Sequence, residues 1–261
     1  MKNRGTGAET RDLDWHGLYR IVGVAALVAG LLFRRNIAAE VGLFGGQASP
    51  VSVGDWFALL QSNRLLGLVY LNVLDIVNYV LVGLMFLALW AALRRARSQM
   101  VVATTLALVG IAVYLASNTA LSMLALSEQY AAATAEAQRT QLVAAGQALL
   151  AIHRFAGPGA HPGAGGYVSL FLVALAGLLT SLVMLRSRLF NRATAIVGII
   201  ASALDLAYCL AYAFLPAIDR ALLAVALIPA AGLFLMAWHI LVGLKLYRLG
   251  RSEGKALPKQ A

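Results

Sequence analysis

The sequence predicts an all-α fold, a bundle of six transmembrane helices with the N- and C-termini on the cytoplasmic side. Two observations lead to this prediction. Hydrophobic residues make up 61% of the 261 residues and charged residues only 12%, about half the charged share of soluble domains. Long stretches with few or no charges also recur along the chain, each close to the roughly 20 residues that a helix needs to cross a bilayer.

Six stretches have the length and hydrophobicity of membrane spans, and together they form one membrane domain, 17–247. We expect the polar segment 1–16 and the basic segment 248–261 to be cytoplasmic tails. The first span is short enough to be the core of a signal peptide, but Arg34 and Arg35 follow it where a cleavage site needs small residues. We therefore expect an uncleaved helix. The six predicted spans are about 17–33, 65–93, 100–126, 167–185, 193–215 and 220–247.

Two further helices are predicted outside the spans. In the loop 34–64, the segment 53–60 carries Trp56 and Phe57, which suit the headgroup boundary. The segment 127–155 between spans three and four is more polar, with leucines at near-helical spacing, and it predicts an amphipathic helix on the outer surface. A plain extension of the third span into water is the alternative interpretation. This segment is also where a protein partner would dock.

Charge placement indicates the orientation of the bundle. The formal net charge is +10, which in a soluble protein would suggest nucleic acid as a partner. Here most basic residues cluster at helix ends, so the expected partner is the lipid bilayer and not nucleic acid. With the N-terminus inside, most of the arginines and lysines lie on the cytoplasmic side. Abundant arginine and alanine favour a bacterial inner membrane.

Three ionisable residues lie deep inside predicted spans. Counting residues from the helix ends places Asp75, Asp205 and His239 near the middle of the bilayer, in one layer. An aspartate at a helix centre costs about 2.5–3.5 kcal/mol on insertion scales, and such residues face the bundle interior. A carboxyl group removed from water favours its neutral form. We therefore expect both aspartates to be protonated, or paired with His239 or a basic residue.

Other polar residues share helix faces with these groups. Asn72, Asp75 and Tyr79 have the spacing i, i+3, i+7, and Asp205, Tyr208 and Tyr212 repeat it. In the third span, Tyr114, Asn118 and Ser122 also share one face. These faces predict a buried polar seam built from spans two, three, five and six. The candidate ligand- or proton-binding residues are Asp75, Asp205, His239, Asn72, Asn78, Tyr79, Asn118, Tyr208 and Tyr212. The alternative is that these side chains, the asparagines above all, only hydrogen-bond between helices and fix their packing.

The sequence carries no motif for a cofactor, a metal or a catalytic group. No glycine-rich phosphate loop follows a strand, and no two of the four histidines have the spacing i, i+4. One intramembrane histidine cannot provide the two ligands of a bis-histidine haem. We therefore assign no catalytic residue, no metal ligand and no cofactor.

Four stretches resemble an uncharacterised family of bacterial multi-pass membrane proteins, defined only as a domain of unknown function (DUF4386-like). They are LYRIVGVAALVAGLLF, RLLGLVYLNVLDIVNYVLVGLMFLALW, GIAVYLASNTALSMLALSEQYAAA and AWHILVGLKLYRLG. The resemblance covers about residues 17–250. It implies six helices in a bacterial inner membrane, and it transfers no functional residue to this chain.

Three functional hypotheses follow from the sequence. The leading one is a small transport or ligand-binding bundle, in which the polar seam accepts a proton or a small polar or amphipathic ligand. The second is an accessory or assembly subunit, whose polar residues serve packing and whose segment 127–155 docks a partner. The third is a membrane enzyme that acts on lipid, with the two aspartates and His239 as acid–base groups.

Overall fold

The computed structural model describes residues 17–32, 50, 52–93, 96–152 and 163–252, and every regular element in this part of the chain is a helix. The first is Gly17–Leu32. The helices that follow are α2 (Val53–Ser62), α3 (Arg64–Tyr70), α4 (Val73–Ala92), α5 (Arg97–Ser117), α6 (Ala120–Ala132), α7 (Glu136–Ile152), α8 (Ala164–Arg186), α9 (Arg192–Phe214) and α10 (Ala217–Ser252). The predicted tail 1–16, residue 33 of the first span and residues 253–261 lie outside the described residues.

Five stretches of helix are long and apolar enough to cross a membrane. This confirms the prediction of an all-helical membrane bundle. The described part of the first helix, Gly17–Leu32, is apolar but extends only about 24 Å, against a hydrocarbon core of about 30 Å. A sixth span therefore stays a prediction. The five candidate spans are Val73–Ala92, Ser98–Ala132, Ala164–Arg186, Arg192–Phe214 and Ala226–Arg251.

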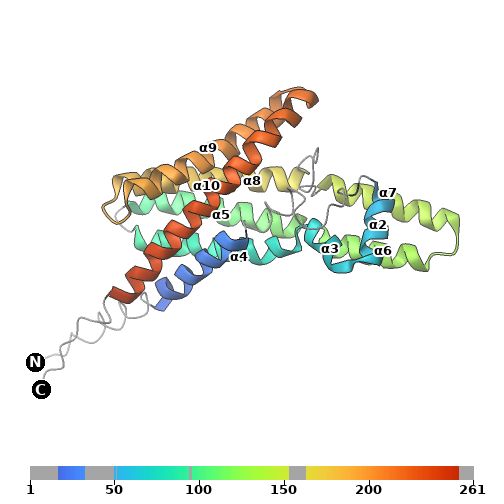
Figure 1. Cartoon of the computed structure of the whole chain (residues 1–261), viewed down its shortest axis with the longest axis horizontal. Coiled ribbons are helices and arrows are strands. Elements are labelled where there is room, and N and C mark those ends of the chain that lie inside the picture. Colours follow the sequence, from blue (N-terminus) through green and yellow to red (C-terminus); the bar gives the residue numbers. More distant parts are fainter. Residues whose placement is uncertain (1–16, 33–49, 51, 94–95, 153–162, 253–261) are drawn as a thin grey trace, which may run out of the picture.

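The long helices pack in a simple order. Helix α5 packs against both α4 and α8, α8 packs in turn against α9, and α9 packs against α10. In Figure 1, α4, α5 and α8 run side by side, and α10 crosses them at a steep angle. The shared core contains large side chains such as Met85 and Phe86 together with buried alanines such as Ala107 and Ala176. Small residues let membrane helices approach closely, so these alanines account for the tight contacts.

The helix Gly17–Leu32 packs against the second half of α10, and two glycines make the crossing close. A Cβ atom on Gly23 would lie 2.6 Å from the backbone nitrogen of Tyr247, and one on Gly243 would lie 2.9 Å from the carbonyl oxygen of Gly23. Further along, Gly30 lies beside Ile240. The residue numbers rise on one helix and fall on the other, so the two helices are antiparallel.

The helix predicted over 65–93 is not continuous. It is interrupted at Leu71 and Asn72, which separate α3 from α4. Asn72 has φ = 59°, in the left-handed region, and among non-glycine residues asparagine adopts this conformation most readily. Because α4 starts at Val73, Asp75 lies in its first turn and not ten residues inside a helix. The sequence-based depth of Asp75 counts residues along an unbroken helix from residue 65, which the structure does not contain.

The third predicted span is also interrupted. Helix α5 ends at Ser117 and α6 begins at Ala120, so the helix expected over 100–126 breaks at Asn118 and Thr119. The Asn118 side chain stabilises the break, because its Oδ1 accepts a hydrogen bond from the backbone N–H of Ala120 at 3.1 Å. Asparagine competes with the helix backbone in this way, which explains why the helix stops here.

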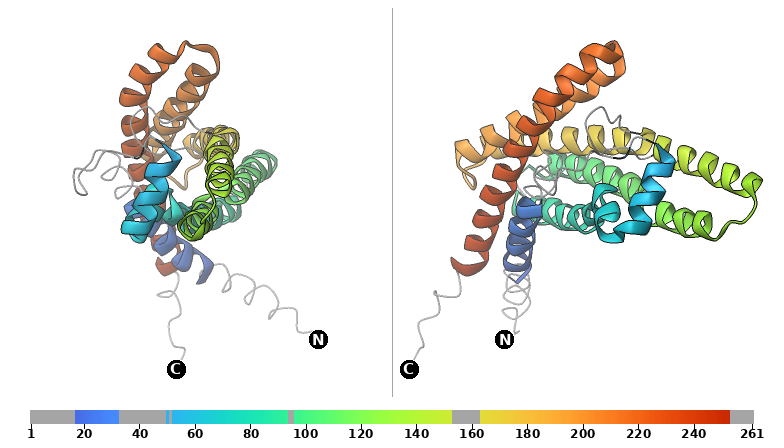
Figure 2. Two further views of the ribbon diagram at one scale, coloured as in Figure 1. Left: turned by 90° about the vertical axis from the view of Figure 1, so that its right-hand side faces the viewer. Right: turned by 45° about the vertical axis from the view of Figure 1, so that its right-hand side comes forward.

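Four helices at one end of the bundle, α2, α3, α6 and α7, form an end cluster with its own hydrophobic core. Trp56, Phe57 and Leu60 of α2 are buried there together with Met123 of α6 and Leu150 of α7. The predicted helix 53–60 is present as α2, which starts at a capping box formed by Ser52 and Asp55. Figures 1 and 2 show α6 and α7 extending beyond the ends of α4 and α8.

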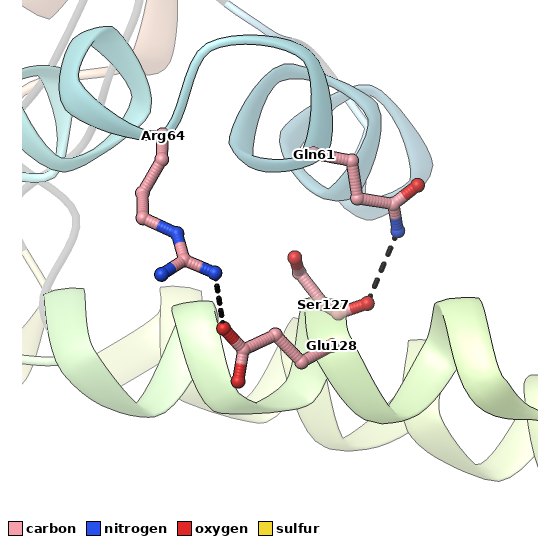
Figure 3. Close-up of polar contacts among 4 residues, drawn as sticks. All are labelled: Gln61, Arg64, Ser127 and Glu128. Carbon is pink, nitrogen blue, oxygen red and sulfur yellow. Dashed lines mark hydrogen bonds and ion pairs between the residues drawn. The ribbon is translucent and has the colours of Figure 1, made fainter.

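Polar contacts join the outer side of the end cluster. Gln61 Nε2 donates to the carbonyl oxygen of Ser127 at 3.1 Å, and Arg64 forms an ion pair with Glu128 (Figure 3). The Arg64 and Glu128 side chains are 62% and 55% exposed. Exposed ion pairs contribute about 0–1 kcal/mol, so the apolar core, and not this pair, stabilises the end cluster.

The segment predicted as one helix over 127–155 is divided between two helices. Residues 127–132 belong to α6, the chain turns at 133–135, and α7 runs antiparallel to α6 over Glu136–Ile152 (Figures 1 and 2). Gly146 of α7 lies against Val53 and Phe57 of α2, where a Cβ atom would be 2.5 Å from Val53 Cγ1. Residues 153–155 lie outside the described part of the chain. Surface attachment of this segment to a membrane stays a prediction.

Candidate functional site

The break at Asn72 sets the position of Asp75. The backbone N–H of Asp75 donates to the carbonyl oxygen of Asn72 at 3.1 Å, which starts α4. The Tyr114 hydroxyl, from α5, donates to Asp75 Oδ2 at 3.2 Å. The Tyr114 ring stacks on the Tyr79 ring, with centroids 3.8 Å apart and planes 7° apart. Asp75, Tyr79 and Tyr114 therefore form one contact group between α4 and α5.

A cavity of about 160 Å³ lies between α4, α8, α9 and α10. Helix α4 contributes one continuous face to its lining, and the spacings i, i+3, i+4, i+7 and i+11 put these residues on the same side of the helix. They are Asp75, Asn78, Tyr79, Val82 and Phe86. The predicted candidates Asp75, Asn78 and Tyr79 thus line the same cavity.

The other predicted ionisable residues reach this cavity from α9 and α10. Asp205 lines it together with Ser202, one turn away on α9. His239 and Trp238 line it from α10. The structure therefore brings together Asp75, Asp205 and His239, which come from three separate helices and are far apart in the sequence.

The common depth of the three ionisable groups in a bilayer stays a prediction. The sequence places them in one layer by counting residues along unbroken helices, and the break at Asn72 removes that count for Asp75. Within α4, Asp75 precedes Phe86 by eleven residues, or about 16 Å. Phe86 contacts Trp238, the neighbour of His239, with ring centroids 6.3 Å apart. Helix α10 therefore meets α4 near Phe86.

His239 is held in a fixed orientation. Its side chain is 1% exposed, and Nδ1 lies 2.7 Å from the carbonyl oxygen of Leu235, one turn earlier in α10. A carbonyl oxygen only accepts hydrogen bonds, so Nδ1 carries the proton and, in the neutral ring, Nε2 is the acceptor. The Trp238 ring meets the imidazole edge-on at 5.3 Å. This packing fixes the orientation of the imidazole in the cavity wall.

Asn78 is the most unusual polar group of the lining. Its side chain is 0% exposed, and within the described part of the chain neither Nδ2 nor Oδ1 has a hydrogen-bond partner. Leaving a buried polar group without a partner costs about 1–3 kcal/mol. A donor and an acceptor are therefore available in the cavity, and a polar molecule bound there could satisfy both.

Helix α8 contributes a wall that sequence reasoning missed. Leu170, Val173, Ala174 and Gly177 line the cavity, whereas no residue of α5 does among those described. A Cβ atom on Gly177 would lie 2.6 Å from Ser202 Oγ, so this glycine lets α8 and α9 approach closely. Span three therefore contributes no wall to the cavity. It joins the predicted polar seam through the buried Tyr114, whose hydroxyl bonds to Asp75.

The remaining predicted candidates lie elsewhere. Asn72 and Asn118 occupy the two helix breaks. Tyr208 and Tyr212 of α9 do not line the cavity. They form an aromatic group with Tyr167 of α8, whose ring centroid lies 5.6 Å from that of Tyr212. The Tyr167 hydroxyl donates to the carbonyl oxygen of Cys209 at 3.2 Å, so these residues join α8 to α9.

Among the described residues, no three His, Cys, Asp or Glu side chains lie close enough together to hold a metal ion. The chain matches no protein-family model, no curated protein and no solved structure. The family resemblance noted from the sequence therefore stays a prediction.

Proposed function

We propose that the protein crosses a bacterial inner membrane six times, with both termini on the cytoplasmic side. The antiparallel packing of Gly17–Leu32 against α10 supports a sixth span, because α10 is itself a candidate span. Arg186, Arg188 and Arg192 flank the turn from α8 to α9, as expected for a cytoplasmic loop. Large apolar side chains such as Val77 and Leu87 are exposed on α4 and would face lipid.

We further propose that the bundle binds a small polar or amphipathic ligand, or a proton, as part of transport across the membrane. One observation supports this most directly. Two aspartates, a histidine and a buried asparagine without partners line one cavity among apolar helices. Ionisable residues are costly inside a membrane, and they commonly mark ion or substrate pathways. Residues that served only packing would be expected to satisfy one another, and Asn78 is not satisfied.

Proteoliposomes that contain the full-length protein test this function. Proton flux is driven by a membrane potential and followed with an internal pH dye, for the wild type and for Asp75→Asn and Asp205→Asn. We expect each substitution to reduce the flux about tenfold or more, because hydrogen bonds to charged groups contribute about 1.5–3 kcal/mol. Asp55→Asn is the matched control, since Asp55 caps α2 outside the cavity. Unchanged flux in both cavity variants would refute proton transport through this site.

The end cluster favours a second candidate function, that of an accessory or assembly subunit. It has its own core beyond the bundle, and most of α7 is exposed. If the end cluster docks a partner protein, a photo-crosslinking amino acid in place of the exposed Gln141 of α7 should give a discrete crosslinked product with that partner in cells. The same residue at Arg188, also exposed but at the opposite end of α8, serves as the control. Absence of any adduct at Gln141 would argue against this candidate.

A further inference from the structure

We propose that the ligand of the cavity is a small organic cation with an apolar body. This inference rests on the proposed binding function and specifies its substrate class. Asp75 and Asp205 are the acidic residues of the lining, and no lysine or arginine lines the cavity among the described residues. When ionised, these carboxyl groups select against anions and favour a positive charge, and a bound cation in turn favours their ionised form.

The walls of the cavity favour an organic cation over a bare metal ion. Phe86, Trp238 and Tyr79 provide three aromatic rings, and most of the remaining lining is aliphatic. Cations bind over the faces of such rings, tryptophan being the best, and quaternary ammonium groups are recognised in this way. A metal ion would instead require several oxygen or nitrogen ligands, and no such group occurs in the described part of the chain.

Asn78 adds a position for a polar substituent. It lies one turn from Asp75 on the same face of α4, and its amide offers a donor and an acceptor that no described residue uses. A ligand with a hydroxyl or an amine near its charged end would satisfy this amide. The site therefore suits a molecule that carries a cation, a neighbouring hydrogen-bonding group and a hydrocarbon surface.

The volume of the cavity limits the size of the ligand. Its roughly 160 Å³ is close to that of an engineered protein cavity of about 150 Å³ that binds benzene. This is the scale of about six to ten non-hydrogen atoms, as in choline or a short alkylamine. Larger amphipathic cations would exceed the space between the four helices.

The test measures which charge enters the cavity. Single cysteines are placed in the lining of the full-length protein at Ser202→Cys on α9 and at Ala174→Cys on α8, in a Cys209→Ala background. Ser181→Cys on α8 is the control, because Ser181 is buried and does not line the cavity. Each protein in lipid nanodiscs is treated with three thiol reagents that differ in charge: cationic aminoethyl, anionic sulfonatoethyl and neutral methyl methanethiosulfonate.

Focusing by a cleft of one charge sign raises the local concentration of counter-ions by about 10- to 1,000-fold. We therefore expect the cationic reagent to react at least about tenfold faster than the anionic one at positions 202 and 174. This ratio of rates is divided by the ratio that the same two reagents give with a free thiol. Only the thiolate form of each cysteine reacts, and its fraction affects both reaction rates equally. The ratio of the two rates therefore measures the charge preference of the cavity and not the reactivity of the thiol. The preference for the cationic over the anionic reagent should be smaller in the Asp75→Asn and Asp205→Asn variants.

The outcomes separate the two proposals. If the neutral reagent labels both positions and the cation shows no preference over the anion, the organic cation is refuted and a small-ligand cavity remains. If no reagent, including the neutral one, labels either position faster than the Ser181→Cys control, the cavity admits no small molecule, and the proposed function fails as well. If an aspartate variant does not fold, the charge preference in the other proteins still decides the inference.

Discussion

The Asn118 side chain donates a hydrogen bond from Nδ2 to the carbonyl oxygen of Asn72 at 3.4 Å. This bond joins the two points at which the long helices are interrupted. One break separates α3 from α4 and the other separates α5 from α6. Both lie where the bundle meets the end cluster. The same Asn72 carbonyl accepts from the backbone of Asp75, so the first turn of α4 and the break between α5 and α6 share one acceptor.

Replacing Asn118 by alanine should destabilise the protein by about 1–3 kcal/mol, because two hydrogen bonds of about 0.5–1.5 kcal/mol each are lost. These are the bonds to Asn72 and to the N–H of Ala120. Reversible unfolding in mixed detergent micelles measures the free energy of unfolding. Ser122→Ala, an exposed position one turn into α6, should change it by no more than about 0.5 kcal/mol. Equal effects of the two substitutions would show that the break needs no side-chain support.

Asn72 should tolerate glycine and reject valine. Its φ of 59° costs an ordinary L-residue about 1–2 kcal/mol and glycine almost nothing. Asn72→Gly should therefore stay within about 1 kcal/mol of the wild type, since it keeps the carbonyl acceptor, whereas Asn72→Val should be at least about 1–2 kcal/mol less stable. The same unfolding assay compares them. A valine variant as stable as the glycine variant would mean that α3 and α4 can join into one helix.

The bond between Tyr114 and Asp75 can be isolated with a double-mutant cycle. Tyr114→Phe removes the hydroxyl and keeps the ring that stacks on Tyr79. Combined with Asp75→Ala, which leaves no acceptor for the hydroxyl, it should show a coupling energy of about 0.5–2 kcal/mol in unfolding measurements. Tyr114→Leu should cost about 0.5–1.5 kcal/mol more than Tyr114→Phe, because the aromatic pair is also lost. Additive effects of the phenylalanine and alanine substitutions would exclude a direct bond.

The glycine crossing between Gly17–Leu32 and α10 provides a prediction with an internal control. An alanine at Gly23 would bring its Cβ within 2.6 Å of the Tyr247 backbone, so the helices must separate, which should cost about 1–3 kcal/mol or more. At Gly17 nothing lies within 4 Å of the added Cβ. Gly17→Ala should be neutral or stabilise the helix by up to about 1 kcal/mol. Equal stability of the two alanine variants would contradict the close packing.

The helices and the grouping of ionisable residues could be predicted, because both follow from the physics of a bilayer. Long apolar stretches must be helical in lipid, and charged groups such as Asp205 and His239 must turn inward. The contribution of α8 could not be predicted. Leu170, Val173, Ala174 and Gly177 look like any other apolar residues, and only the packing of the helices makes them a cavity wall.

The two breaks were missed for a different reason. Asn72 and Asn118 lie inside long apolar stretches, where hydrophobic patterning predicts a continuous helix. An asparagine in such a stretch can hydrogen-bond to another helix or interrupt its own, and the residue type alone does not distinguish these outcomes. The left-handed conformation of Asn72 is seen only in the folded chain. This one residue makes Asp75 part of the first turn of α4 instead of the interior of a longer helix.

The length of the segment Ser98–Ala132, which contains α5 and α6, affects how other molecules can reach this protein. Its 35 residues extend about 50 Å, and the hydrocarbon core takes up only about 30 Å of that. If α5 crosses the bilayer over its own length, the tip of α6 and the turn into α7 would stand about 20 Å clear of the lipid. Antibodies and proteases in the adjoining compartment would meet this tip first, and a bulky tag inserted there would leave the buried helices undisturbed.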